Sequence, residues 1–466
     1  MDVKVKVIKT EVVTPNPPCH EHWLPFTNLD LLVPPIDTGS FLYYKKPFKH
    51  VHVAKMISDL KTSLSRALGL YYPLAGQIKA NMGSELGIYC NNRGVVFIEA
   101  IADIELRELN FYEPDKNAGG KLMPERRRGV LAVQVTMLKC GGMVLACLYD
   151  HRVVDGYSVN LFTHSWANMT TLSRPPTLIP NFRRSDLNAR RPRTYTPYVA
   201  NMYIPLSNLR LPQTNSRSPY QDALKNQIYY IKGDQIKSLQ GLASENGCPR
   251  SQMESVVSFL WKITASFLED SGHLGYMCNL IIPMDGRRWL SDGEGIEKEK
   301  QIGARCGNVF SMPFIGIQSK DLKDMPLSKL ANEVHELLES VSTKEHFKGL
   351  IDWVEDQRPK TLISRPLAEN EKGASIMVTS GVKFLLKGNK DFGMGKPAFV
   401  SCYVPSARWD WHVMLLPSPV NENDWIVYMH LPKKHLNYIE AHASHLFKPL
   451  TAPYLNLVLN HCVARM

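Results

Sequence analysis

Residues 143–156 read MVLACLYDHRVVDG, and this stretch decides how the surrounding chain folds. It opens with an unbroken apolar run to Tyr149, which is typical of a strand buried on both faces. The alternating segment 131–137 before it, and the Gly141-Gly142 pair between them, predict an antiparallel hairpin. The apolar run ends at Asp150-His151, and we expect a helix to begin near Ser158. A histidine therefore stands where a buried strand ends.

Helical and extended patterns alternate on both sides of this stretch. Apolar residues recur at helical spacing over 51–70, and residues 86–98 read as a hairpin that turns at 91–94. Further along, the pattern predicts strands near 227–231, 275–283, 375–378 and 425–430, and helices near 236–244, 251–267, 327–340 and 347–353. Such alternation predicts an α/β or α+β fold.

The chain changes character over residues 171–222, where prolines recur among Ser, Thr, Asn and Arg. That composition is too polar for a core and too rich in proline for a helix. We therefore expect a domain over residues 1–180, a crossover linker over 181–222, and a second domain over 223–466.

Composition narrows the function classes. With 44% hydrophobic and 21% charged residues, the chain is an ordinary globular protein. The net charge of +11 fits a phosphate-bearing small ligand at least as well as nucleic acid, because the basic clusters lack interleaved aromatics. Scattered cysteines without a C-x-x-C pair favour a reduced, cytoplasmic protein. We expect no membrane span, since no window approaches ~20 apolar residues, and no signal peptide.

His151 is the sharpest candidate for chemistry, because a neutral imidazole is the natural base for a hydroxyl or an amine. A core histidine satisfied by a backbone carbonyl is the alternative. Asp155 follows four positions later and could form a dyad with His151, or could hold the loop by pairing with Arg287; the structural role is favoured. Gly156 would let the backbone turn tightly.

Other chemistries find little support in the sequence. Residues 391–397, DFGMGKP, lack the glycine spacing and the Ser/Thr of a P-loop, and predict a tight structural turn. There is no G-x-S-x-G and no H-E-x-x-H, and no motif marks the further ligands that a metal site at the close histidine pairs 20–22 and 50–52 would need. We expect no metal site.

Two motifs together resemble a known family. H-x-x-x-D at 151–155, followed by DFGMG at 391–395, is similar to the paired signatures of the plant BAHD acyltransferases, whose second motif is D-F-G-W-G. Supporting family matches span the chain: HWLP at 22–25, YPLAG at 72–76, DGR at 285–287, GNV at 307–309 and LLPSP at 415–419. Residues 425–431, WIVYMHL, and the N-terminal stretch look nearest to the coniferyl alcohol acyltransferase branch.

The resemblance implies two chloramphenicol-acetyltransferase-like domains joined by a long crossover, with an active-site channel at their interface and the strand near 376–387 packing with the N-terminal domain. It implies that acyl-CoA is the donor co-substrate, that no cofactor stays bound, and that the protein is a monomer. The histidine would deprotonate the acceptor, which attacks the thioester directly. The motif aspartate would pair with the arginine of D-x-R, here Arg287, and the loop that contains Asp391, Gly393 and Gly395 would be structural.

Further roles carry over by matching position. Arg250 and Ser251 fall where the family contacts coenzyme A, and Thr379 and Ser380 fall on the channel-lining strand, where a hydroxyl could hold the tetrahedral oxyanion. The alternatives are a solvated helix start and ordinary strand residues.

The chain departs from the family at four positions. Met394 replaces the motif tryptophan, and Gly381 replaces a tryptophan that shikimate-using relatives carry, so we expect an opened pocket at Gly381. Asp37 and Leu42 replace an acceptor-binding histidine and tyrosine, which argues against shikimate. Asp37 could bind a hydroxyl or an amine, or cap a turn.

The leading hypothesis is therefore transfer of an acyl group from acyl-CoA to the hydroxyl of a phenylpropanoid-type or alkaloid-type alcohol. The alternatives are N-acylation of an amine, and a catalytically decayed acyltransferase-like protein that works through partners.

Overall fold

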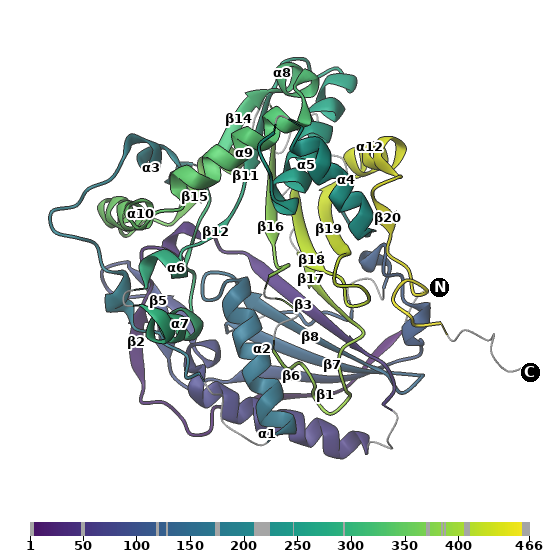
Figure 1. Ribbon diagram of the computed structural model, residues 1–466. Coiled ribbons are helices and arrows are strands. Elements are labelled where there is room, and N and C mark those ends of the chain that lie inside the picture. The colour runs from purple at the N-terminus through teal and green to yellow at the C-terminus, as the bar shows by residue number, and fades with distance from the viewer. Residues whose placement is uncertain are drawn as a thin grey trace, which may run out of the picture.

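The computed structural model describes residues 4–47, 52–117, 121–126, 129–172, 178–208, 224–245, 247–291, 294–369, 373–383, 385, 388–404 and 411–458. Two large β-sheets dominate it, each with helices on one face (Figure 1). Within the described part of the chain, no helix is both long enough and apolar enough to cross a membrane.

The first sheet has six strands in the order β1-β6-β7-β8-β3-β17. Their bounds are Val5–Val13, Val95–Ala102, Leu131–Leu138, Met143–Asp150, Asp37–Tyr44 and Phe399–Tyr403. Every residue of β8 is buried, as its apolar run predicts. Helices α1 (Val53–Leu70) and α2 (Gly156–Thr171) cover one face, where Leu64 and Trp166 join Leu42 and Leu145 in one core.

The second sheet has seven strands in the order β14-β11-β16-β18-β19-β10-β20. Their bounds are Phe314–Gln318, Met277–Ile281, Gly373–Ser380, His412–Pro417, Trp425–Pro432, Leu224–Ile231 and Lys448–Pro449. Residues of α4 (Gly233–Ala243), α5 (Gln252–Asp270), α9 (Leu327–Val341) and α12 (Lys433–Ala443) share an apolar core with one face of this sheet. Alternate residues of each strand therefore point away from these helices.

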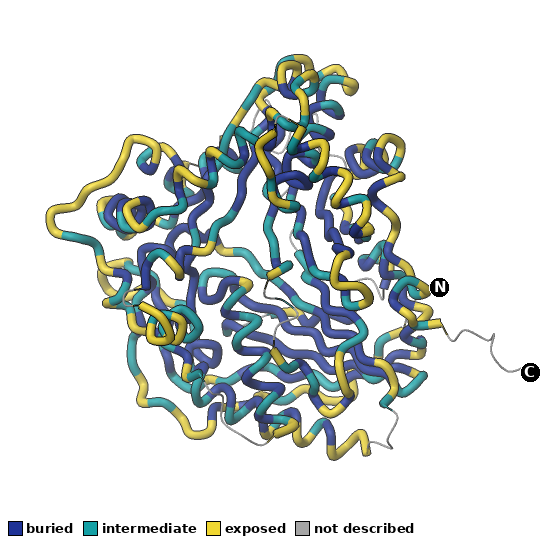
Figure 2. The backbone as a smooth tube through the Cα atoms, viewed as in Figure 1, coloured by how far each residue is buried: buried dark blue, intermediate teal, exposed yellow. Residues whose placement is uncertain are grey.

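The two sheets meet through their remaining faces. Phe41 and Leu148 of the first sheet share a buried cluster with Leu416 and Ile426 of the second. Buried tubes run through both sheets in Figure 2, while exposed residues lie mainly on the outer helices and loops. Residues that follow β8 are thus held beside the second sheet.

Smaller elements complete the fold. The bounds of the short strands are β2 His22–Pro25, β4 Gln77–Ala80, β5 Leu86–Cys90, β9 Tyr203–Pro205, β12 Met284–Asp285, β13 Phe310–Ser311 and β15 Leu362–Ser364. The remaining α-helices are α3 Pro197–Asn201, α6 Arg287–Leu290, α7 Gly295–Ala304, α8 Ser319–Asp324, α10 Lys344–Gln357 and α11 Arg365–Ala368. Short 3-10 helices lie at η1 Asp30–Leu32, η2 Tyr72–Ala75, η3 Leu106–Glu108, η4 Pro114–Lys116, η6 Arg184–Leu187 and η7 Leu206–Asn208.

One strand prediction was wrong, and the bounds of another differ from those expected. Residues 86–98 do not form a hairpin, because β5 pairs with β2 and β4 in a three-stranded sheet while β6 pairs with β1 and β7. The strand near 376–387 ends at Ser380 and hydrogen-bonds inside the second sheet, although Met377 and Leu385 also pack against the core beneath α1 and α2. Residues 384, 386 and 387 lie outside the described part. The strand that the C-terminal half gives to the first sheet is β17, which pairs with β3.

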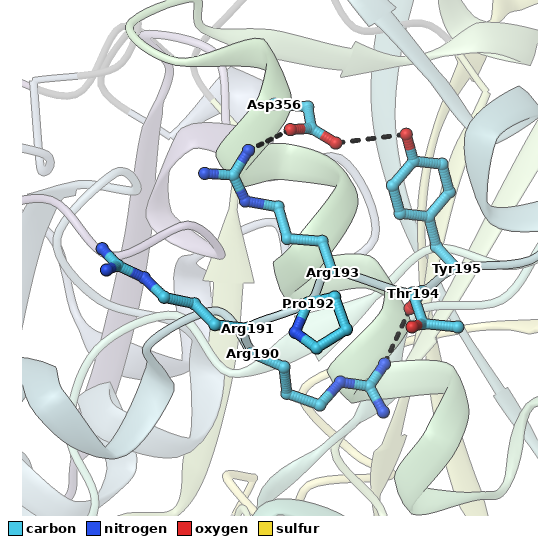
Figure 3. Close-up of a pocket in the computed structure, with 7 residues that line it drawn as sticks. All are labelled: Arg190, Arg191, Pro192, Arg193, Thr194, Tyr195 and Asp356. Atoms are coloured by element: carbon cyan, nitrogen blue, oxygen red, sulfur yellow. Dashed lines mark hydrogen bonds and ion pairs between the residues drawn. The ribbon is translucent and has the colours of Figure 1, made fainter.

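The crossover is fixed to α10 by ion pairs. Arg190 Nε donates to Asp352 Oδ2 at 2.7 Å, and Thr194 N donates to the same oxygen at 3.0 Å. Arg193 binds Asp356 (Figure 3). Residues 190–195 and Asp356 also border an open hollow of about 600 Å³, which has no lining residue in common with the predicted site. Residues 209–222 of the expected linker lie outside the described part.

Candidate active site

His151 lies just beyond β8 and is held through its backbone. Its N–H donates to Ile36 O at 2.9 Å, and its carbonyl accepts from Asn308 Nδ2 at 3.0 Å. The imidazole is half-buried with its edge toward Phe310, at a centroid distance of 6.1 Å. Nδ1 is buried and has no hydrogen-bond partner among the described residues, so Nε2 is the nitrogen left for an incoming acceptor.

Asp155 does not form a dyad with His151, because donors on other elements occupy its carboxylate. Ser158 N donates to Oδ1 at 2.9 Å, which makes Asp155 the N-cap of α2, and Val309 N donates to Oδ2 at 3.2 Å. Arg287 adds a bidentate pair, with Nη1 to Oδ2 at 2.8 Å and Nη2 to Oδ1 at 3.0 Å. The expected Asp155–Arg287 pair is therefore present.

Arg287 is itself almost fully buried, at 1% exposure. It also donates to the carbonyls of Arg305 and Gly307, and its guanidinium lies 4.4 Å from the centre of the Tyr157 ring. Burial alone would raise the pKa of Asp155, but the charge of Arg287 and the hydrogen bonds outweigh it and hold that pKa below its usual value. The buried Asp155–Arg287 ion pair therefore supports the loop that carries His151.

Gly156 does not have the role expected of it. It is the first residue of α2, it is exposed, and it is not among the residues with a positive φ. The turn therefore does not require glycine.

Asp37 faces the site but is not free to bind an acceptor. Arg126 Nε and Nη2 donate to its Oδ1 at 2.9 and 2.5 Å, and Nη2 also lies 3.0 Å from Asp150 Oδ2. Arg152 holds the other side of the fully buried Asp150 with Nε to Oδ1 at 2.9 Å. Two carboxylates and two guanidinium groups thus neutralise one another beside His151.

The surroundings of Leu42 and Gly381 bear on the predicted acceptor pocket, which Leu42 does not line. Leu42 is 2% exposed and packs in the core beneath α1 and α2, because strand alternation turns it away from the second sheet. At Gly381 a Cβ would lie 3.4 Å from Leu385 Cβ and Met414 Cε and 3.5 Å from Leu416 Cδ2, which are ordinary van der Waals contacts. Three side chains therefore line this position.

The structure separates Thr379 from Ser380. Strand alternation puts Thr379 on the face of β16 that points away from the helices, and Ser380 on the opposite face. Ser380 Oγ accepts from Val382 N at 3.4 Å, which closes the strand end. Thr379 Oγ1 lies 2.9 Å from His412 Nε2, so it is the hydroxyl available on the His151 side.

Arg250 and Ser251 lie directly before α5 as expected, but both already have hydrogen-bond partners within the protein. Arg250 Nε and Nη2 donate to Asn332 Oδ1 at 2.9 and 2.7 Å. Ser251 Oγ accepts from Glu254 N at 3.2 Å, and Glu254 Oε2 accepts from Ser251 N at 2.6 Å, which together form a capping box. Ser251 is therefore the N-cap of α5.

The loop at 391–395 is a closed turn. Asp391 Oδ1 accepts from Gly393 N at 2.7 Å and Gly395 N at 2.9 Å, and both glycines have positive φ, 89° and 83°. Phe392 packs against Trp166, at a centroid distance of 4.7 Å, and Met394 is 5% exposed in the same core. Met394 thus fills apolar space where the family motif has tryptophan.

Gly393→Ala should lower the free energy of unfolding by about 1–2 kcal/mol, because alanine must adopt a left-handed conformation. The new Cβ meets no atom within 4 Å, so the cost is conformational. Denaturant unfolding measures the change, with exposed Lys396→Ala as the matched neutral control. A large loss of turnover with unchanged unfolding would contradict a structural loop.

Sequence reasoning missed two residues at this site, Asn308 and His412. Asn308 lies within the GNV match, and its Nδ2 binds His151 O and Asp30 Oδ1, but spacing alone does not join it to a histidine so far along the chain. His412 has no local motif; only its place opposite His430 on adjacent strands marks it.

The two sheets each carry helices on one face, and His151 lies between them. This arrangement defines a two-domain α/β fold of the chloramphenicol-acetyltransferase type. In a comparison of folds, the TRI101 structure from F. graminearum, complexed with coenzyme A and deoxynivalenol, has a TM-score of 0.72 at 14% identity over 92% of this chain and 99% of that one.

The Transferase family model matches residues 3–446, so the chain belongs to that family, the plant BAHD acyltransferases. Rosmarinate synthase of Plectranthus scutellarioides is 27% identical, covering 94% of this chain and 99% of its own. Anthranilate N-benzoyltransferase protein 2 of Dianthus caryophyllus is 25% identical, covering 95% and 99%.

Proposed function

We propose that the protein transfers an acyl group from acyl-CoA to the hydroxyl of a small aromatic plant metabolite, of phenylpropanoid or alkaloid type. The observation that supports this most is the isolation of His151: its backbone is fixed, Nδ1 is enclosed, and Asp155 is committed to Arg287. A neutral imidazole so held can take one proton from an acceptor.

The proposed reaction is a direct displacement. The acceptor oxygen forms a bond to the thioester carbon while its proton passes to His151 Nε2. The Thr379 hydroxyl would donate to the oxyanion of the tetrahedral intermediate. When the C–S bond breaks, the thiolate takes the proton back from His151, so the products are an ester and free coenzyme A.

An uncharged alcohol is favoured over an amine by the charges around His151. Asp37 and Asp150 are both paired with arginines, so neither of these carboxylates is left to attract an ammonium group. Met377 and Met414, which alternate with Thr379 and His412 on neighbouring strands, offer soft apolar contacts to an aromatic ring.

A thiol-release screen over acyl-CoAs, with matched alcohol and amine acceptors, tests this proposal. We expect thiol release with aromatic alcohols and an ester by mass spectrometry. Amide as the main product would replace the proposal with N-acylation, and no release with any pair would favour a decayed enzyme.

We also propose that the protein is a cytoplasmic monomer. Its two domains lie near 1–180 and 223–466, and acyl-CoA binds beside Arg250. Seven cysteines of the described residues are free thiols, which suits a reducing compartment: Cys19, Cys90, Cys140, Cys147, Cys278, Cys306 and Cys402.

A further inference from the structure

His412 and Thr379 form a pair that the family motifs do not contain. His412 begins β18 and Thr379 lies one residue before the end of β16, on adjacent parallel strands. Nε2 of His412 and Oγ1 of Thr379 are 2.9 Å apart. Its other hydrogen-bond partner among the described residues is Val413 O, which accepts from Oγ1 at a longer 3.4 Å. The imidazole is therefore the main partner of this hydroxyl.

His412 stays neutral at any ordinary pH. Burial lowers its pKa to about 3, and the neighbouring His430 and His151 add smaller effects in the same direction. Because this pKa lies far below neutrality, the ring carries a single N–H.

A single N–H on His412 decides what the threonine hydroxyl can do. If Nε2 carries the hydrogen, it donates to Oγ1, and the hydroxyl hydrogen of Thr379 is left for another acceptor. If Nε2 lacks the hydrogen, Thr379 must donate to it and has none left for an oxyanion.

We propose that His412 is a positioning residue, which donates from Nε2 to Thr379 Oγ1 and so directs the Thr379 hydroxyl hydrogen toward the thioester oxyanion. This rests on the proposed acyl transfer. His412 does not touch the reacting atoms; it acts through Thr379.

The strand behind His412 is held firmly enough for this role. His430 of β19 lies opposite His412, and its Nδ1 is 2.7 Å from Asn226 Oδ1. Tyr428 Oη donates to the same oxygen at 2.5 Å. These polar residues alternate with the apolar residues that pack beneath α4, α5 and α12, so they form an ordered row on the face away from those helices.

A double-mutant cycle tests the pair. We expect kcat to fall about 100-fold in Thr379→Val, which keeps the shape and loses the hydroxyl. His412→Leu should lower kcat about 3- to 10-fold, because one hydrogen bond is lost. The double variant should match Thr379→Val alone, with KM for both substrates unchanged, and His412→Gln should recover much of the loss by donating from its amide.

His435→Leu is the matched control. This histidine is fully buried, on α12 against the opposite face of the same sheet, with neither ring nitrogen hydrogen-bonded among the described residues. Its effect on kcat, if any, should be the same with Thr379 or Val at position 379. If His412→Leu lowered kcat equally in both backgrounds, or if Gln restored nothing, the pair would have no positioning role.

The cycle separates this inference from the proposed function. Thiol release by the wild type that disappears in His151→Ala supports the function whatever the cycle shows. Additive effects of His412 and Thr379 in an active enzyme would overturn only the positioning role, whereas an inactive wild type would remove the function on which it rests.

Discussion

Arg287→Met should lower the free energy of unfolding by about 3–5 kcal/mol, because it leaves the Asp155 carboxylate buried without its partner. The guanidinium makes hydrogen bonds to Asp155, to Ser158 and to two backbone carbonyls, and methionine replaces none of them. Turnover should fall with stability, because Asp155 also caps α2 and ties residue 309 to the histidine loop.

Urea unfolding of Arg287→Met beside Arg288→Met measures this cost. Arg288 is exposed next to the buried arginine, so its replacement should change stability by less than about 0.5 kcal/mol. Equal midpoints for the two variants would show that the buried pair contributes little.

The contribution of the Asp155–Arg287 pair to stability should depend on pH. Because the folded-state pKa of Asp155 is lowered, its pairing stabilises the protein above the ordinary carboxyl pKa of about 4 and is lost as the pH falls further. The stability difference between wild type and Arg287→Met should therefore shrink toward strongly acidic pH. A difference that stayed constant would contradict the ionised pair.

His151→Ala should lower kcat about 10²- to 10⁴-fold, the usual contribution of a general base. Alanine keeps both backbone hydrogen bonds, to Ile36 O and from Asn308 Nδ2, so the loop should keep its shape. Steady-state thiol release at saturating acyl-CoA measures the loss, and His442→Ala, at an exposed position of α12, serves as the control. Full turnover with unchanged melting temperature would mean that another group is the base.

Local pattern was enough to predict most of the helices and strands. The run over 143–149 became β8, the helical spacing over 51–70 became α1, and the Gly141-Gly142 turn joined β7 to β8. Each of these signals lies within one element or one tight turn.

Non-local pairing was where pattern failed. The turn residues at 91–94 suggested a hairpin, but the neighbours of β5 are β2 and β4, whose positions in the sheet depend on tertiary packing. Nor does any local signal tell that β17 crosses to pair with β3.

In the candidate site, too, some contacts could be predicted from motifs and others could not. The pairing of Asp155 with Arg287 could be expected from two motifs, whereas the capture of Asp37 by Arg126 depends on a loop whose path the sequence does not specify. Leu42 was misplaced because matching positions to a family says nothing of which side a strand residue faces until the register is known.

Rapid mixing of the enzyme with acyl-CoA, with and without an aromatic alcohol, tests direct transfer through His151 most directly. Thiol release and the intact mass of the protein are followed together. We predict thiol release only when the acceptor is present, no acyl adduct on the protein, and loss of that release in His151→Ala. A burst of thiol equal to the enzyme concentration without acceptor, matched by an acylated protein mass, would contradict it.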